Sequence, residues 1–115
     1  MRVLILLALT ASFLLSVPAL AQERMTAADL ERLCSSASDL DYGYCAGYVT
    51  AVADEMTKGS LGDFRACGHV AVRSQQYIDI FKAYVAGHPG TRTDDADRAV
   101  AAAFARAFPC GSGAP

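Results

Sequence analysis

Apolar side chains in this chain recur mainly at helical spacing, and alternating patterns typical of strands are nearly absent. Beyond an apolar stretch at the N-terminus, four segments place hydrophobic residues three and four positions apart, which is the period of one face of an α-helix. The helices are expected from about residue 26 to 34, 42 to 58, 69 to 86 and 93 to 108. The pattern therefore predicts an all-α domain.

Capping residues mark the ends of these expected helices. Thr26 is a suitable N-cap for the first helix, and Asp29 follows three residues later, where the acid of a capping box lies. Gly59 is placed to end the second helix. Pro89 follows the end of the third, because the residue before a proline avoids the helical conformation, and Pro109 ends the fourth. Short connections favour antiparallel neighbours, so we expect a small antiparallel four-helix bundle-like domain.

The third expected helix has the clearest apolar face, formed by Val70, Ser74, Tyr77, Ile78, Phe81, Tyr84 and Val85. The second expected helix contains Gly47, which costs about 1 kcal/mol relative to alanine inside a helix. A packing reason would offset that cost. We therefore expect Gly47 to let another helix approach closely.

The N-terminal apolar stretch has the layout of a secretory signal peptide. Arg2 precedes an apolar run over residues 3–17, and Ala19 and Ala21 place small residues at the −3 and −1 positions before Gln22. A run of about 15 residues is shorter than the roughly 20 needed to span a bilayer. We expect residues 1–21 to be a cleaved signal peptide and residues 22–115 to form one exported domain.

The charge of the mature chain argues against one class of partner. The whole chain has ten Lys and Arg against twelve Asp and Glu, so removal of Arg2 leaves nine basic against twelve acidic residues. No block of basic residues is present, which argues against nucleic acid as a partner. No second apolar run follows, so we expect no membrane insertion after signal cleavage.

Four cysteines in a short exported chain predict a disulfide framework. An up-down-up-down order of helices would place Cys34 and Cys45 at one end of the bundle, and Cys67 and Cys110 at the other. This arrangement favours the pairs Cys34–Cys45 and Cys67–Cys110, while the other two connectivities remain open. There is no Cys-x-x-Cys motif to suggest a redox or zinc site.

The two histidines are the only ordinary candidates for acid–base chemistry. His69 lies two residues after Cys67, a proximity that suggests a cysteine–histidine nucleophile. An oxidised Cys67 could not serve, and no third residue is indicated to orient the imidazole. His88 is better placed to cap carbonyl groups at a helix C-terminus. We therefore predict no catalytic residue, no metal and no cofactor, and a binding or structural protein rather than an enzyme.

Several short motifs occur together, in a fixed order, over most of the expected mature chain. They are Leu33-Cys34, Tyr44-Cys45-Ala46-Gly47-Tyr48-Val49, Phe64-Arg65-Ala66-Cys67, Gln76 to Tyr84-Val85, His88-Pro89, Ala103-Phe104 and Phe108-Pro109-Cys110. In this order and spacing the chain resembles the Rap/Tai family of periplasmic immunity proteins. The resemblance implies an all-helical fold in the periplasm, often as a homodimer. It also implies a protein that binds and blocks a peptidoglycan amidase delivered by type VI secretion.

An immunity protein acts by covering a cleft, so its contact residues are expected on exposed connections rather than within scaffold motifs. The first candidate surface is the loop from residue 58 to 65, and the second is the turn from 90 to 93. The candidate partner-binding residues are Lys58, Ser60, Leu61, Asp63, Phe64, Arg65, Thr91 and Arg92. The alternatives are a periplasmic helical chaperone of the acid-stress type and an accessory envelope protein without a toxin partner.

Overall fold

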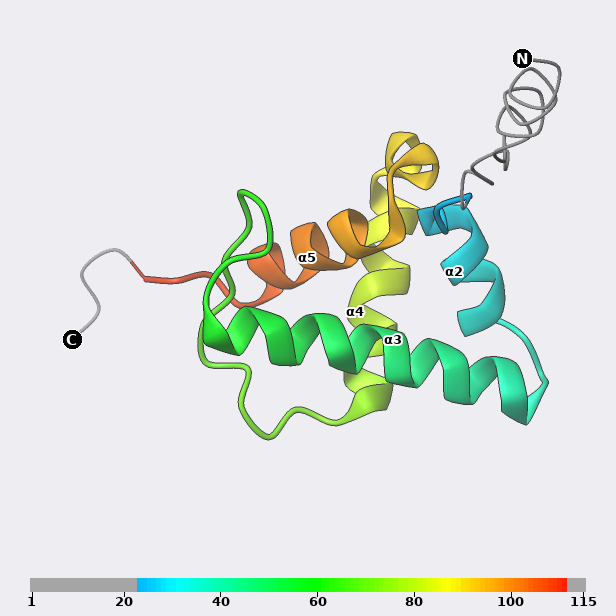
Figure 1. Ribbon diagram of the computed structural model, residues 1–115, viewed down its shortest axis with the longest axis horizontal. Helices are drawn as coiled ribbons and strands as arrows, with labels where there is room; N and C mark the ends of the chain where they lie inside the picture. The colour runs from blue at the N-terminus through cyan, green and yellow to red at the C-terminus, as the bar shows by residue number, and fades with distance from the viewer. Residues whose placement is uncertain (1–22, 112–115) are drawn as a thin grey trace, which may run out of the picture.

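The computed structural model describes residues 23–111, which contain four α-helices and one short 3-10 helix (Figure 1). The elements are α2 (Ala27–Cys34), α3 (Asp39–Lys58), α4 (Ser74–Gly87), η1 (Pro89–Thr93) and α5 (Ala96–Ala107). The prediction of an all-α domain is confirmed. The predicted signal peptide, residues 1–21, lies outside the described residues.

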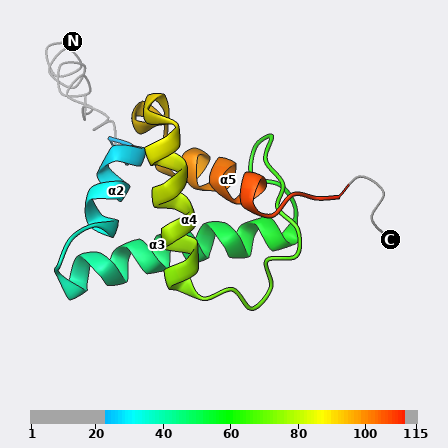
Figure 2. The same cartoon turned by 180° about the vertical axis from the view of Figure 1, so that it is seen from behind.

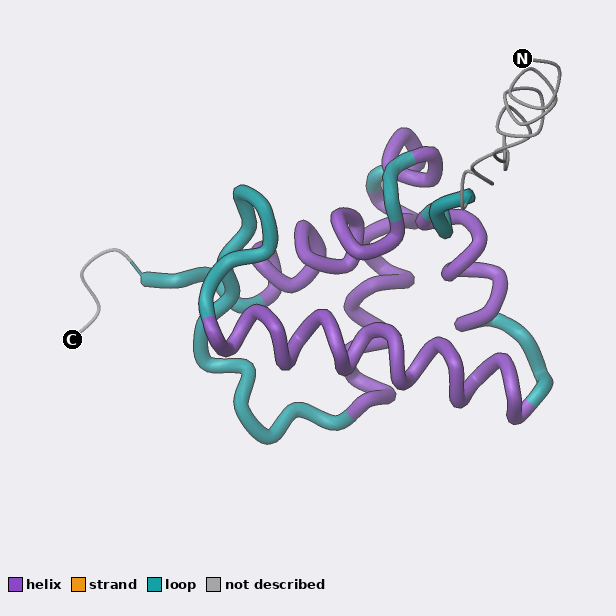
Figure 3. The backbone as a smooth tube through the Cα atoms, in the orientation of Figure 1, coloured by secondary structure: helices purple, strands orange, loops and turns teal. Residues whose placement is uncertain are grey.

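Helix α4 holds the other helices together. It packs against both α3 and α5, passing behind α3 in Figure 1 and in front of it in Figure 2. Helix α2 packs beside the N-terminal half of α3. Figure 3 shows that the connection between α3 and α4, residues 59–73, is the longest non-helical stretch of the part described. The core lies where the helices cross.

Aromatic and aliphatic side chains fill this core. Phe81 of α4 and Phe104 of α5 are fully buried, and the centroids of the Tyr77 and Phe104 rings lie 4.8 Å apart. Four alanines of α5 are buried in this core, and such small side chains allow helices to pack closely. The complete buried set is Ala27, Leu30, Cys34, Cys45, Val49, Val52, Ala53, Met56, Ala66, Tyr77, Ile78, Phe81, Val85, Ala96, Ala99, Val100, Ala101, Ala103 and Phe104.

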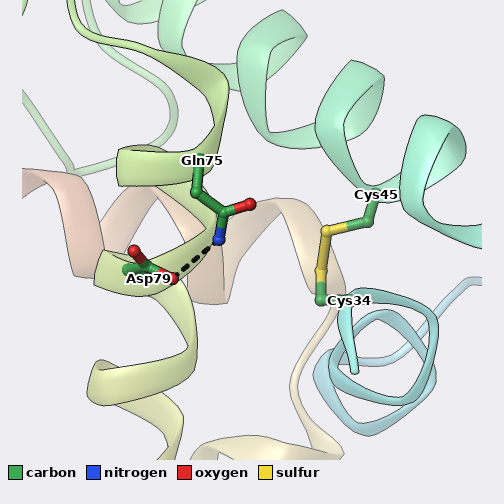
Figure 4. Close-up of a disulfide and its surroundings, with 4 residues drawn as sticks. All are labelled: Cys34, Cys45, Gln75 and Asp79. Atoms are coloured by element: carbon green, nitrogen blue, oxygen red, sulfur yellow. Dashed lines mark hydrogen bonds between the residues drawn. A yellow bond between two sulfur atoms is a disulfide. The ribbon is translucent and has the colours of Figure 1, made fainter. Parts of the chain in front are cut away.

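Both favoured disulfides are present. Cys34–Cys45 joins the end of α2 to α3 with a Cα–Cα distance of 5.1 Å (Figure 4). Both of its residues are buried, and the neighbouring α4 carries the Gln75–Asp79 hydrogen bond drawn in the same view. Cys67–Cys110 ties the connection between α3 and α4 to the segment after α5, with a Cα–Cα distance of 4.9 Å.

The segment before α2 is fastened to the start of α5. The Ala27 amide donates to the Asp94 carbonyl at 2.9 Å, and the Ala96 amide donates to the Met25 carbonyl at 2.9 Å. The predicted capping box is also present, because Thr26 and Asp29 exchange side-chain to backbone hydrogen bonds. These hydrogen bonds therefore hold the start of α2 against the start of α5, although the two segments are far apart in sequence.

Helix α3 begins earlier than predicted, at Asp39 instead of Tyr42. Ser38 is the N-cap, and its side chain accepts a hydrogen bond from the Asp41 amide at 3.4 Å. The polar residues of its first turn are compatible with a solvent-facing helix start. The predicted C-terminal end is confirmed, since Gly59 is the C-cap.

Helix α4 begins later than predicted, at Ser74 instead of His69. Ala71 has a φ of 65°, in the left-handed region that interrupts a right-handed helix. The expected place of Val70 on the apolar face is wrong, because this side chain is 81% exposed. The His69 side chain and carbonyl are instead bonded to α3 and α4, which keeps this segment out of helical geometry.

Helix α5 also begins later than predicted, at Ala96 instead of Thr93. Pro89 starts the 3-10 helix η1, which carries the chain to Thr93 before the backbone extends at Asp94 and Asp95. Asp95 then forms the N-cap of α5 without a side-chain capping bond. The N-terminus of α5, where the helix dipole is positive, therefore follows Asp94 and Asp95 in the chain.

Candidate protein-binding surface

The loop from residue 58 to 65 has a fixed backbone at its tip. The Leu61 amide donates to the Phe64 carbonyl at 3.0 Å, and the Phe64 amide donates to the Leu61 carbonyl at 3.1 Å. Gly62 lies between them with a φ of 58°, a conformation that glycine adopts without strain. Leu61 and Phe64 pack partly against the core, while Ser60 and Asp63 are exposed. The loop therefore presents polar groups on a backbone that is tied down.

Basic side chains surround this loop tip. The Arg98 guanidinium of α5 lies over the Phe64 ring, 5.5 Å from its centroid, in a cation–π contact. Arg65 is exposed and forms no ion pair with any residue in 23–111. Lys58 pairs with Glu55 at 3.4 Å, also on the exposed surface. The candidate surface at the loop thus carries the basic residues Lys58, Arg65 and Arg98 beside the acidic residues Glu55 and Asp63.

In the second candidate segment, residues 90–93, the side chains of Thr91 and Arg92 are bonded to other parts of the fold. The Thr91 hydroxyl donates to the His88 carbonyl at 2.7 Å. Arg92 forms a bidentate ion pair with Glu31 of α2, with nitrogen–oxygen distances of 3.0 and 3.2 Å. Figures 1 and 2 show α5 between this turn and the loop at 58–65. The structure does not bring the two candidate segments together into one patch.

His69 is a buried structural residue rather than part of a cysteine–histidine pair. Its side chain is 3% exposed, and Nε2 donates to the Ala53 carbonyl at 3.0 Å. The Tyr77 hydroxyl donates to the His69 carbonyl at 2.7 Å. Cys67 is bonded to Cys110, so no thiolate lies beside the imidazole. His69 connects α3 to the segment that precedes α4.

His88 caps the C-terminus of α4, as predicted. Its Nδ1 donates to the Tyr84 carbonyl at 2.8 Å, and its ring stacks on the Tyr84 ring with centroids 4.3 Å apart. The carbonyls of the last helical turn lack partners within the helix, so a side-chain donor there satisfies one of them. This geometry accounts for His88 without a catalytic role.

A groove between α4 and α5 was not predicted from the sequence. Its volume is about 480 Å³, and small apolar side chains form most of its walls. Its lining residues are Ile80, Ala83, Tyr84, Gly87, His88, Ala103, Arg106 and Ala107. The sequence places small residues at these positions, but it does not indicate that they line an opening between two helices.

The described residues offer little reactive chemistry. Among residues 23–111 no three His, Cys, Asp or Glu side chains gather in a group that could hold a metal ion. Burial, and next the charge of Asp97, raise the pKa of Tyr48 above its ordinary value, which favours the neutral phenol. None of the described helices combines the length and apolar character needed to cross a membrane.

Comparison with known proteins identifies a matching family. The model of a family described as Rap1a immunity proteins matches residues 26–110, which include all five described helices and both disulfides. No curated protein and no solved structure matched the chain.

Proposed function

Since the chain belongs to the Rap1a immunity protein family, we propose that it binds and occludes a peptidoglycan amidase effector of type VI secretion. The family match over residues 26–110 is the observation that carries this proposal. The two disulfides fit an oxidising compartment, and with the predicted signal peptide they support the periplasm as its location. We also propose that the protein acts as a homodimer.

Inhibition of this kind needs no reactive group on the inhibitor. It needs a surface that stays in shape while it covers a substrate cleft, because ordering a flexible loop on binding costs affinity. The loop from residue 58 to 65 meets this need, since its tip is closed by two backbone hydrogen bonds and backed by half-buried Leu61 and Phe64. Exposed Arg65 and Lys58 would steer an acidic rim of the amidase toward this loop.

The test uses any peptidoglycan amidase found to be co-encoded with this protein, with its cell-wall hydrolysis measured at increasing inhibitor concentration. We expect Arg65→Glu to weaken inhibition about tenfold or more, because it replaces an attractive charge with a repulsive one. Arg73→Glu is the matched control, since Arg73 is also exposed but lies beyond the loop, at the N-cap of α4. Equal inhibition by wild type and both variants would remove the loop from the contact surface.

The same experiment separates the alternatives. Absence of binding to any co-encoded hydrolase would contradict the immunity function itself. If the protein then suppressed aggregation of unrelated clients in acid, the chaperone alternative would replace it. If neither activity were found, an accessory envelope role would be the remaining hypothesis.

A further inference from the structure

The groove between α4 and α5 is an opening that the proposed inhibitory surface does not use. Its volume of about 480 Å³ lies within the range of about 300–1,000 Å³ that is typical of small-molecule sites. Neither candidate partner-binding segment, residues 58–65 or residues 90–93, contributes a side chain to its lining. The groove is therefore a cavity of ligand size outside both segments.

Small residues leave this space open between the two helices. Half of the eight lining residues are alanine or glycine, namely Ala83, Gly87, Ala103 and Ala107. Ala103 is only 1% exposed, so the floor of the groove belongs to the core. A ligand in the groove would therefore contact an apolar surface that is continuous with the interior.

Gly87 differs from the other glycine that the sequence singles out. A Cβ added at Gly87 would meet nothing within 4 Å, and the same is true of Gly47 in α3. The expectation that Gly47 admits another helix of this chain is therefore not met within residues 23–111. At Gly87 the open space belongs to a groove that also has Tyr84 and Ala107 in its lining.

One side of the groove is built from rings that are held in place. The Tyr84 and His88 rings stack with centroids 4.3 Å apart, and His88 Nδ1 donates to the Tyr84 carbonyl at 2.8 Å. Ile80, one turn before Tyr84, packs partly against the core. Binding to fixed walls avoids the cost of ordering loose side chains.

The charge of the lining is unlike that of the chain as a whole. The chain has twelve acidic residues against ten basic ones, yet none of the eight lining residues is Asp or Glu. Arg106, in the last turn of α5, is exposed and forms no ion pair with any residue in 23–111. Charge complementarity therefore favours a ligand with an anionic group and disfavours a cationic one.

The apolar walls restrict the rest of the ligand. A peptide has a donor and an acceptor at nearly every residue, and burial without partners is costly for both. The polar side-chain groups in the lining are limited to the Tyr84 hydroxyl, the His88 ring and the Arg106 guanidinium. An alkyl chain has no group that needs a partner, so it suits these walls better than a peptide or a sugar.

We propose that the groove between α4 and α5 binds a single-chain alkyl carboxylate, a ligand of the fatty-acid class. The chain lies against the alanines and Gly87, and the carboxylate pairs with the Arg106 guanidinium, whose planar fork matches its two oxygens. This binding goes beyond the proposed inhibition and does not require the amidase.

The first test titrates the oxidised, isotope-labelled protein with sodium decanoate below its micellar concentration and follows the amides by NMR. We expect saturable binding, with shifts at the groove residues, and about tenfold or more weaker binding for Arg106→Gln. Arg98→Gln is the matched control, because Arg98 is also exposed on α5 but does not line the groove. Lack of saturable binding, or equal effects of the two variants, would overturn the proposal.

The second test varies the ligand instead of the protein. Octanoate should bind about fivefold more weakly than decanoate, because it buries two fewer methylene groups. Decyltrimethylammonium has the same chain with the opposite charge, and it should not bind at concentrations at which decanoate saturates the protein. Equal binding of the anion and the cation would mean adsorption without a site and would overturn the proposal.

The third test fills the groove. Ala83 and Ala86 are both exposed on α4, but only Ala83 lines the groove. We expect Ala83→Phe to abolish decanoate binding without changing the circular dichroism spectrum, and Ala86→Phe to bind as wild type does. Suppose that decanoate does not bind, and that Ala83→Phe instead weakens inhibition of an amidase or changes the sedimentation of the protein. The groove would then belong to the amidase or to a second copy, and the proposal would be overturned.

Discussion

A small network at the start of α2 couples one carboxylate to the fold. The Thr26 hydroxyl donates to Asp29 at 2.8 Å, the Thr26 amide donates to the same carboxylate at 3.1 Å, and Arg32 approaches its other oxygen at 3.0 Å. These bonds, first the one from the Thr26 side chain, hold the pKa of Asp29 below its ordinary value. The ionised carboxylate of Asp29 therefore stabilises the folded state more than the protonated carboxyl does.

We expect Asp29→Asn to lower the stability of the protein near neutral pH but not in strong acid. Because the folded-state pKa is depressed, the stabilisation is complete above the unfolded-state value, near pH 4, and is lost as the pH falls toward the folded-state value. Urea unfolding at about pH 7 and about pH 3 measures the change. Asp39→Asn, at an exposed position in the first turn of α3, is the control. The same deficit at both pH values would contradict the linkage.

Residue-level prediction worked best where a local motif decides the structure. The capping box at Thr26 and the carbonyl cap at His88 each depend on residues within one helical turn, and both are present. The role of His69 depends on Ala53, which lies sixteen residues earlier on another helix. Nothing in the local sequence indicates that contact, so the hydrophobic period places His69 in a helix that it does not join.

At the scale of elements, the hydrophobic period predicts that the four helices exist. It does not predict where each helix starts, because the start depends on contacts with other parts of the chain. Periodicity extended α4 back to His69 because Val70 fits the apolar face. The structure instead exposes Val70 and turns the backbone at Ala71. The loop at 58–65 could be predicted from its glycines and polar residues. The groove between α4 and α5 could not, because it depends on how two helices that are separate in sequence pack against each other.

The two disulfides differ in accessibility, and this predicts the order in which they open. Cys34 and Cys45 are 8% and 0% exposed, whereas Cys67 and Cys110 are both exposed. Since thiol–disulfide exchange requires direct approach to a sulfur, limiting reductant should open Cys67–Cys110 first. Alkylation of the native protein followed by mass mapping identifies the freed cysteines. Early labelling of Cys34 or Cys45 would show that local opening, rather than surface exposure, controls reduction.

At the scale of the whole molecule, one disulfide joins α2 to α3 and the other joins the segment before α4 to the segment after α5. They close non-overlapping loops, with sequence separations of 11 and 43 residues. In the chain-entropy model these loops are worth roughly 3 and roughly 4 kcal/mol. Their sum is comparable to the net stability of a small domain, about 5–15 kcal/mol. We therefore expect the disulfides to supply much of the stability of this fold.

This comparison predicts that a variant beginning at Gln22 folds stably only where its cysteines can oxidise. We expect the reduced form to lose most of its resistance to urea, with the helical circular dichroism signal falling at much lower denaturant than in the oxidised form. The paired variant Cys67→Ala with Cys110→Ala keeps the shorter loop and should lie between the two, because only the larger entropic contribution is removed. A reduced protein that unfolds at the same urea concentration as the oxidised one would show that packing of the four helices suffices, and the argument that links this fold to an oxidising compartment would then fail.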